Sequence, residues 1–205
     1  MGTSARDRLS AKKYDPLLAT LADRLGADEA ATLWIDAERR LDALLATTQG
    51  LSDKERLHVE GHIYPMCALF LAIAERCGED EAAAVCADFM RESASAKGAA
   101  LRRLLAVPGM RLVFMRAFGV IGARLFGREA GFGQQMHEAT SHHLRMDITD
   151  CPYQRHCAAA GAPQIAPFFC ANDDYVYGDL PGIAFRRSGT IARGDAVCDF
   201  DLSLT

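Results

Sequence analysis

Residues 142–153 read HHLRMDITDCPY, and within this stretch the chain changes from helical to strand periodicity. Leu144, Met146 and Ile148 alternate with polar residues, which is the pattern of a strand that is buried on one face. Cys151 and Pro152 follow at once, and proline is favoured in the first turn of a helix. The stretch therefore predicts a strand that leads directly into a helix.

Upstream of this stretch, the apolar residues recur at helical spacing in segments rich in alanine, leucine and arginine. Ser52 and Glu55 have the spacing of a capping box, which predicts a helix that runs from there to about Cys77. Pro65 lies inside that helix, so we expect a kink and a free backbone carbonyl near Gly61 or His62. The other predicted helices cover about residues 15–25, 28–47, 80–95, 98–106, 109–126 and 129–141.

Downstream, short helices are predicted at about residues 152–160 and 164–177, followed by two further strands. The strands contain Ile183 with Phe185 and Cys198 to Leu204, and they are joined through Arg193-Gly194-Asp195 as an antiparallel hairpin. The predicted fold class is α+β, with a helical N-terminal half followed by a β-α-α-β-β unit that forms a small antiparallel sheet. We expect a flexible N-terminus (1–13) and a single domain (14–205), helical over 14–141 and α+β over 142–205.

Composition narrows the classes of partner. The chain has 205 residues and a net charge of −4, with no block of basic residues, so we expect no nucleic-acid partner. The most apolar stretch, Met110 to Phe126, is interrupted by Arg111, Arg116 and Arg124, which predicts a buried helix of a soluble protein and no membrane partner. A small-molecule substrate is the expected partner, with a homo-oligomer possible.

The seven cysteines form an odd set without a CxxC pair, and the polar residues 1–13 do not resemble a signal peptide. Both features favour free thiols in a reducing cytoplasm. Four cysteines fall at apolar or junction positions of helices and are predicted to be structural: Cys67, Cys77, Cys86 and Cys157. Cys151, Cys170 and Cys198 are the candidates for function.

Cys151 is predicted to be the N-cap of the helix that Pro152 opens. The positive end of the helix dipole lies there, and it is expected to lower the pKa of the thiol below about 8.5. That setting is typical of a nucleophilic cysteine. A structural thiol at a helix start is the alternative.

Other polar side chains converge on the same unit. Cys170, Asp173 and Tyr177 lie three or four residues apart and share one helix face. If Leu144, Phe185 and Phe200 face the core, strand parity places His142, Arg187 and Cys198 on the same apolar side. The alternative is that each lies at a strand end, where the histidine and the arginine reach solvent and the cysteine is a small hydrophobic residue. His58 and His62 have a zinc-compatible spacing but no HExxH pattern, so they are predicted to face solvent or to lie at the core edge.

These residues form an ordered set: Cys151-Pro152-Tyr153, then Phe169-Cys170 with Asp173, then Phe185-x-Arg187-x-x-Thr190-x-x-x-Gly194-x-x-x-Cys198-Asp199-Phe200. The set resembles the L-2-amino-thiazoline-4-carboxylic acid hydrolase family, whose members close with a similar arginine, threonine, glycine and CDF pattern. The resemblance is firmest over residues 142–204. It extends loosely to the helical segment around His62, Pro65 and Leu69.

The resemblance implies a hydrolase of cytoplasmic, bacterial-type metabolism that opens a small carboxylate-bearing ring at an amidine-like or isothiourea-like C=N carbon. Such a reaction needs a nucleophile, a proton donor and a cation for the carboxylate. Cys151 is expected to be the nucleophile, Asp173 the acid/base, His142 a proton shuttle and Arg187 the carboxylate clamp. The remaining candidates line the pocket: Cys170, Cys198, Tyr153 and Tyr177.

No cofactor is expected, although Cys151, Cys170, Cys198 and His142 would also make a tetrahedral zinc set. A different class stays open as well. Gly194-Asp195-x-x-Cys198-x-Phe200 also resembles the end of 4-vinyl-reductase-type sensory domains, which bind ligands or metal without catalysis. A helical interaction protein with a structural β cap is the third alternative.

Overall fold

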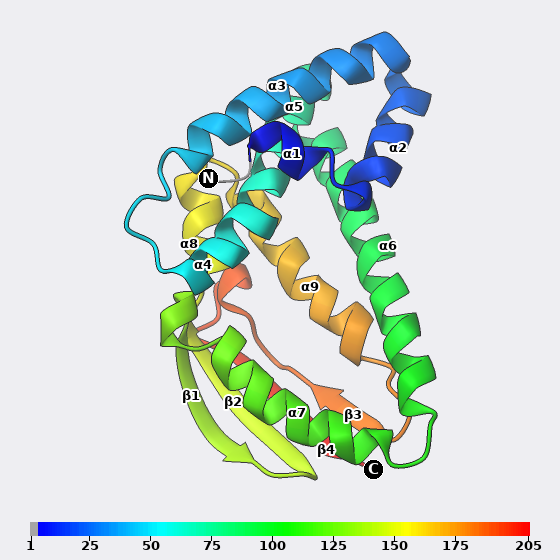
Figure 1. The fold of residues 1–205 in the computed structure, drawn as a ribbon, viewed down its shortest axis with the longest axis vertical. Coiled ribbons are helices and arrows are strands. Elements are labelled where there is room, and N and C mark those ends of the chain that lie inside the picture. Colours follow the sequence, from blue (N-terminus) through cyan, green and yellow to red (C-terminus); the bar gives the residue numbers. More distant parts are fainter. Residues whose placement is uncertain (1–3) are drawn as a thin grey trace.

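The computed structural model describes residues 4–205, and it has the predicted α+β fold, with the helices gathered above a small antiparallel sheet (Figure 1). The strands are β1 (Gly133–Ala139), β2 (His143–Asp150), β3 (Ile183–Arg186) and β4 (Cys198–Leu204). The helices are α1 (Ala5–Leu9), α2 (Asp15–Leu25), α3 (Ala27–Leu45), α4 (Asp53–His58), α5 (Tyr64–Cys77), α6 (Glu79–Leu105), α7 (Met110–Leu125), α8 (Pro152–Ala159) and α9 (Ala166–Tyr177).

The sheet has the order β1-β2-β4-β3, and each neighbouring pair is antiparallel. The pairing of β3 with β4 confirms the predicted hairpin. Met146 lies opposite Phe200 and Ile148 opposite Cys198. Since partners in register share a face, these side chains point to the same side as Leu144, which is buried. This inner face of the sheet is covered by α7 and α9 and lines the site described below.

The predicted helix at 129–141 is wrong, because residues Gly133–Ala139 form the edge strand β1. Glutamine, methionine and glutamate in this segment favour helix locally, but pairing with β2 outweighs that preference. The register shifts twice along the pair, which removes the regular alternation that would have indicated a strand. The C-terminal unit is therefore β-β-α-α-β-β.

Helix α6 runs unbroken through Gly98, where the sequence had predicted a break. The glycine is buried, and a Cβ built on it would lie 2.5 Å from the carbonyl oxygen of Tyr175 in α9. Gly98 therefore lets α6 and α9 approach closely, and α9 carries several residues of the candidate site.

Substitution of Gly98 by alanine is expected to destabilise the fold, because α9 must move to make room for the methyl group. We expect a loss of about 1–3 kcal/mol in the free energy of unfolding, measured by urea denaturation. Gly61→Ala is the matched control, since nothing lies within 4 Å of its Cβ position and alanine favours helix by up to about 1 kcal/mol. Equal stability of the two variants would contradict this account of the helix contact.

The expected kink before Pro65 takes the form of a π-helical turn, Val59–Ile63, between α4 and α5. Proline has no N–H for the carbonyl four residues earlier, so the Gly61 carbonyl is free, as predicted, and accepts a hydrogen bond from Lys13 Nζ at 2.7 Å. The capping box at Ser52 is only half present: Ser52 Oγ accepts from the Glu55 N–H at 3.1 Å, while the Glu55 side chain bonds elsewhere.

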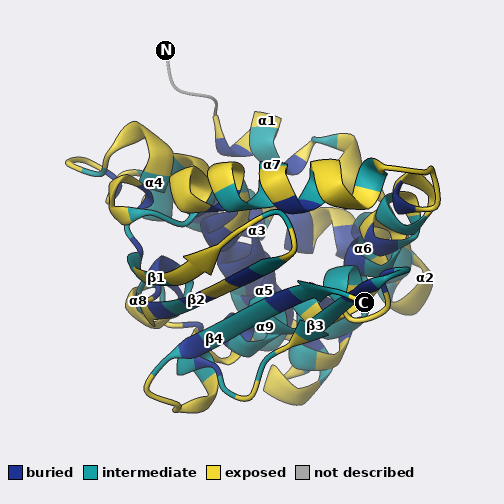
Figure 2. Cartoon of the chain, turned by 90° about the horizontal axis from the view of Figure 1, so that it is seen from below, coloured by how far each residue is buried: buried dark blue, intermediate teal, exposed yellow. Residues whose placement is uncertain are grey.

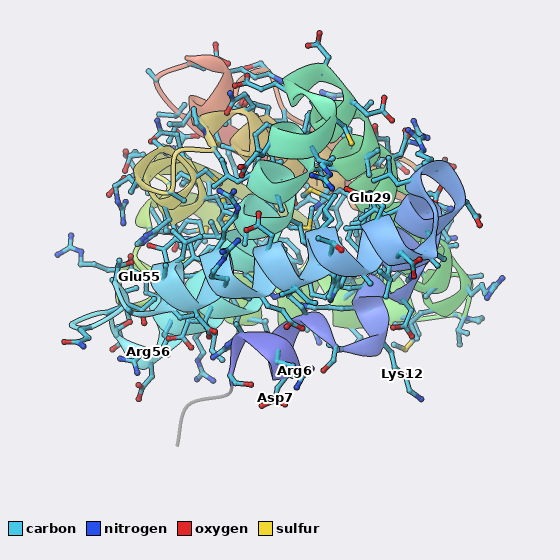
Figure 3. All side chains as sticks on the ribbon, turned by 90° about the horizontal axis from the view of Figure 1, so that it is seen from above. Arg6, Asp7, Lys12, Glu29, Glu55 and Arg56 are labelled. Carbon is cyan, nitrogen blue, oxygen red and sulfur yellow. The ribbon has the colours of Figure 1, made fainter. Side chains whose placement is uncertain are left out.

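The predicted flexible N-terminus differs from the structure. Residues 1–3 lie outside the described part, but Ser4 caps α1 in a capping box with Asp7, and Ala5 and Leu9 are buried. Arg6, Asp7 and Lys12 project outward from this segment (Figure 3). The apolar side chains Ala5 and Leu9 therefore pack α1 against the core.

Helix α7 is not the buried helix that was predicted. Only Met115 and Gly122 are buried, and most of its outer face is exposed along one side of the sheet (Figure 2). A different stretch, Asp53–Cys77, is long and apolar enough to cross a membrane, with a mean hydropathy of 1.3. Because 61% of that apolar window is buried inside the fold, this helix packs in the core.

Candidate active site

A cavity of about 180 Å³ lies between the inner face of the sheet, α9 and the ends of α7 and α8. This volume is below the range of about 300–1,000 Å³ that is typical for drug-sized ligands, so the cavity suits a small molecule. Its lining is mostly apolar with a few polar groups: Phe118, Phe126, Phe132, Met146, Ile148, Cys151, Tyr153, Phe169, Cys170, Asn172, Asp173, Tyr177, Arg187, Cys198 and Phe200.

Seven of the eight predicted site residues line this cavity, and His142 does not. Strand β2 begins at His143, so His142 lies in the turn after β1, where its side chain is exposed and contacts Ser141. The cavity lies at the other end of β2, beside Ile148 and Cys151. Strand parity does not apply to His142, because the strand begins one residue later at His143. The structure gives no support to a role of His142 as a proton shuttle.

Cys198 is the cavity thiol whose surroundings lower its pKa. Its Sγ accepts a hydrogen bond from the Ile191 N–H at 3.2 Å, and the side chain is 5% exposed. A hydrogen bond from the Cys170 thiol, the Ile191 N–H and the nearby Arg187 charge together lower the pKa of Cys198, although burial acts against them. The same hydrogen bond and burial raise the pKa of Cys170. Within this pair, Cys198 therefore loses its proton more readily than Cys170 does.

Cys151 occupies the predicted N-cap position of α8, with Pro152 at the first helical position. The expected pKa is wrong, however. Burial raises the pKa of Cys151 to about 11, and the backbone N–H groups at the start of α8 only partly oppose it. Phe132, Ile148 and Cys198 belong to the same apolar cluster as this thiol. Desolvation by residues that are distant in sequence thus outweighs the local effect of the helix dipole.

Arg187 is the one cationic side chain among the described lining residues, and it is already engaged. Nη1 donates to Asp173 at 3.0 Å, and Nη2 donates to Asp174 at 2.7 Å and to the Cys170 carbonyl at 2.9 Å. The guanidinium also lies over the rings of Phe185 and Phe200, at 5.7 and 5.6 Å. These contacts hold the guanidinium at the cavity wall in one orientation.

Asp173 has an environment suited to an acid that works near neutral pH. Burial raises its pKa to about 7 even though Arg187 acts to lower it, and the neighbouring Asp174 raises it further. The side chain keeps 31% exposure, and it lines the cavity. A carboxyl group with a pKa near the working pH can both donate and accept a proton.

Asp199 explains why an aspartate follows the cysteine in the CDF motif. Its carboxylate accepts from the Ser188 N–H at 2.9 Å and the Gly189 N–H at 2.8 Å. Burial acts to raise the pKa of Asp199, but these bonds and the Ser188 hydroxyl outweigh it and lower the pKa. Asp195 accepts from the Thr190 N–H at 2.8 Å in the same loop. The two carboxylates fix the loop between Arg187 and Ile191. They therefore position the two groups from this loop that lower the pKa of Cys198, the Arg187 guanidinium and the Ile191 N–H.

His58 was predicted to face solvent or to lie at the core edge, without a role in the site. Its Nδ1 lies 2.9 Å from the Tyr153 hydroxyl, and its Nε2 lies 2.9 Å from the Leu125 carbonyl. Because burial lowers the pKa of His58, the ring is neutral, so Nε2–H donates to the carbonyl and Nδ1 accepts from Tyr153. The hydroxyl proton of Tyr153 is thus directed away from the cavity. The spacing to His62 carried no signal of this, because the partner lies 95 residues away.

Asn172 was also missed. It lines the cavity, and its buried Oδ1 has no hydrogen-bond partner among the described residues. An unpaired buried carbonyl is costly unless a ligand or water satisfies it, which marks this atom as an acceptor for a ligand N–H. The only signal in the sequence was that Asn172 lies between two predicted site residues, Cys170 and Asp173.

The described residues contain no group of three or more histidine, cysteine, aspartate or glutamate side chains with the geometry of a metal site. The zinc set considered from the sequence is not assembled, since His142 lies away from the three thiols. His62, the other half of the zinc-compatible pair, is exposed.

The structure is therefore an α+β protein with a small cavity. Three cysteines, one arginine and one aspartate are among the residues that line it. The profile of the L-2-amino-thiazoline-4-carboxylic acid hydrolase family matches residues 56–202, and the chain belongs to this family, which is named for hydrolase activity. Comparison with curated proteins and with solved structures gave no match.

Proposed function

We propose that this protein hydrolyses a small carboxylate-bearing ring at a C=N carbon of amidine or isothiourea type, with 2-amino-thiazoline-4-carboxylate as the reference substrate. The observation that carries the proposal is the cluster of Cys198, Asp173 and Arg187 on one small cavity. The cluster supplies the nucleophile, the acid and the cation that the reaction needs. All seven cysteines are free thiols, which favours a reducing compartment such as the cytoplasm.

Cys198 replaces Cys151 as the proposed nucleophile. Its thiolate attacks the ring carbon of the C=N bond, and the ring nitrogen takes the proton of Asp173. The tetrahedral adduct then collapses: a nitrogen lone pair re-forms a C=N bond, and one ring bond to that carbon breaks. The departing ring atom keeps the bonding pair and takes the proton that this nitrogen releases, which leaves the carbon bound to Sγ. A water molecule displaces Cys198, and the Asp173 carboxylate takes the proton from that water. The net reaction adds one water to the ring, and both side chains return to their starting states.

Arg187 and Asn172 account for substrate orientation. The substrate carboxylate binds Arg187 through the guanidinium N–H groups that its three hydrogen bonds to α9 leave free. Its negative charge raises the pKa of Asp173 further, so the acid is protonated in the complex. The exocyclic N–H of the substrate donates to Asn172 Oδ1, which otherwise has no partner. Tyr153 and Tyr177 form walls, and burial raises the pKa of both phenols, so they stay neutral.

The test is turnover of 2-amino-thiazoline-4-carboxylate, followed by loss of ring absorbance, together with detection of free thiol. Appearance of a thiol indicates C–S cleavage, and appearance of an amine without a thiol indicates C–N cleavage. The control substrate is 2-aminothiazoline without the carboxylate, for which a much higher KM is expected. Saturable binding of the ring with no change in absorbance would contradict hydrolysis and favour the sensory-domain alternative.

Asp173→Asn is expected to lower kcat by about 10²–10⁴-fold, because an amide cannot act as a general acid near neutral pH. In the wild type, kcat falls as the pH rises through the pKa of Asp173, since the carboxylate form is inactive in the first step. The variant should lose this alkaline limb, which a kcat profile between pH 5 and pH 9 measures. Asp174→Asn is the control, and it should keep the limb. An unchanged alkaline limb in Asp173→Asn would assign it to another group.

A further inference from the structure

We propose that α7 and the turn before it form a docking surface for an anionic lipid membrane. The proposal does not depend on the hydrolase reaction. Its first observation is charge: between Ser93 and Arg128 there are seven basic residues and no acidic ones, and all 27 acidic residues of the chain lie elsewhere. The basic residues are Lys97, Arg102, Arg103, Arg111, Arg116, Arg124 and Arg128.

The second observation is exposed apolar surface in the same segment. Seven of the ten large apolar side chains that are exposed in the described part of the chain lie between Leu104 and Leu125. Val113 and Val120 are 54% and 57% exposed, and Ile121 is 52% exposed. Single exposed apolar residues are normal, but a contiguous set marks an interaction site. The full set is Leu104, Val107, Leu112, Val113, Val120, Ile121 and Leu125.

Members of both sets share one face of α7. Val113, Arg116, Val120 and Arg124 recur at intervals of three or four residues, so they form one stripe on the outer side of the helix. Figure 2 shows α7 exposed along most of its length, and Figure 1 shows it at the periphery of the fold beside the sheet. None of the seven basic side chains forms an ion pair with a carboxylate in residues 4–205. The charges of Arg116 and Arg124, which are exposed on this stripe, are therefore available to an external anionic surface.

An anionic bilayer fits this face better than a second copy of the chain does. A two-fold dimer pairs the same patch with itself, so Arg116 and Arg124 would face the arginines of the partner copy without compensating acids. At a bilayer, the valines and leucines enter the boundary of the acyl chains. The arginines extend along the helix surface to the headgroup phosphates. The helix is amphipathic and lies on the surface, because the same arginines prevent it from spanning.

The experiment is co-sedimentation of the full chain with vesicles of phosphatidylcholine and phosphatidylglycerol in equal parts, and with pure phosphatidylcholine vesicles. We expect binding to the mixed vesicles that weakens with added salt, and at least about tenfold weaker binding to the neutral ones. Each arginine near a charged surface is worth about fivefold, so Arg116→Glu with Arg124→Glu should weaken binding by about 25-fold or more. Val113→Ser with Val120→Ser should weaken it at every salt concentration.

Lys12→Glu with Arg39→Glu is the matched control, because it changes the charge equally at exposed positions outside the patch. This double variant should keep at least half of the wild-type affinity, and thermal unfolding should show that all variants are folded. Absence of binding to the mixed vesicles, or equal loss in the control, overturns the proposal. A dimer in light scattering that Val113→Ser with Val120→Ser converts to a monomer would instead assign the patch to self-association. Ring turnover in solution by these variants is expected to match the wild type, which separates this test from that of the reaction.

Discussion

Cys198→Ser is expected to lower kcat for ring opening by about 10³-fold or more, whereas Cys151→Ser is expected to lower it by less than about tenfold. The reason lies in the surroundings of the two thiols. Hydrogen bonds from the Cys170 thiol and the Ile191 N–H lower the pKa of Cys198, while burial raises the pKa of Cys151 to about 11. Both thiols line the same cavity, so the pair of variants tests ionisation and not mere proximity.

The same contrast can be measured without turnover. Iodoacetamide labelling at several pH values, with mass spectrometry of each cysteine peptide, reports the thiolate fraction at each site. We expect Cys198 to label with an apparent pKa below the ordinary value of about 8.5, and Cys151 to remain slow throughout this range. In Cys170→Ala, the apparent pKa of Cys198 should rise, because its hydrogen-bond donor is lost. Faster labelling of Cys151, together with loss of turnover in Cys151→Ser, would restore Cys151 as the nucleophile.

Local sequence patterns located the cavity because its walls are regular elements. The alternation of Leu144, Met146 and Ile148 defined the inner face of β2, and the matching alternation in β4 placed Cys198 on that face. The three-to-four spacing along α9 placed Asp173 beside Cys170 and Tyr177. Periodicity predicts which side chains share a face. The inner face of the sheet and the polar face of α9 belong to one small unit, so they have few ways to pack against each other. This is why seven cavity residues were found without the structure.

Strength and sign of the electrostatic effects were not predictable in the same way. At Cys151 the local helix start favours a thiolate, but the residues that bury the thiol, such as Phe132, come from a segment that was predicted to be helical. Besides the Cys170 thiol, the Ile191 N–H helps to lower the pKa of Cys198, and it comes from a loop that two aspartates hold in place. His58 meets Tyr153 across 95 residues. Such contacts depend on tertiary packing, which no local pattern encodes.

Arg187→Met is expected to lower kcat/KM by about 10²–10³-fold and to shift the whole pH profile towards higher pH. The guanidinium lowers the pKa of both Asp173 and Cys198, so its removal raises both values. The acid limb of the pH profile reports the pKa of Cys198, and the alkaline limb reports the pKa of Asp173. Because both pKa values rise in the variant, both limbs move to higher pH. Loss of the carboxylate clamp raises KM in addition, because no other described lining residue is cationic.

The variant also tests what the arginine contributes to stability. Its side chain is 5% exposed and pairs with Asp173 and Asp174, which are 31% and 48% exposed. Breaking a fully buried pair costs about 3–5 kcal/mol, and we expect a smaller loss here, since both carboxylates keep contact with solvent.

Arg187→Lys separates the two effects on activity. It keeps the charge but loses the two-pronged contact, so kcat/KM should fall by about 10-fold or more while the pH limbs stay within about half a unit of the wild type. If Arg187→Met folds and its pH limbs do not move, the guanidinium does not control the ionisation of Asp173 and Cys198. The proposed division of roles in the cavity would then be wrong, even if hydrolysis itself is observed.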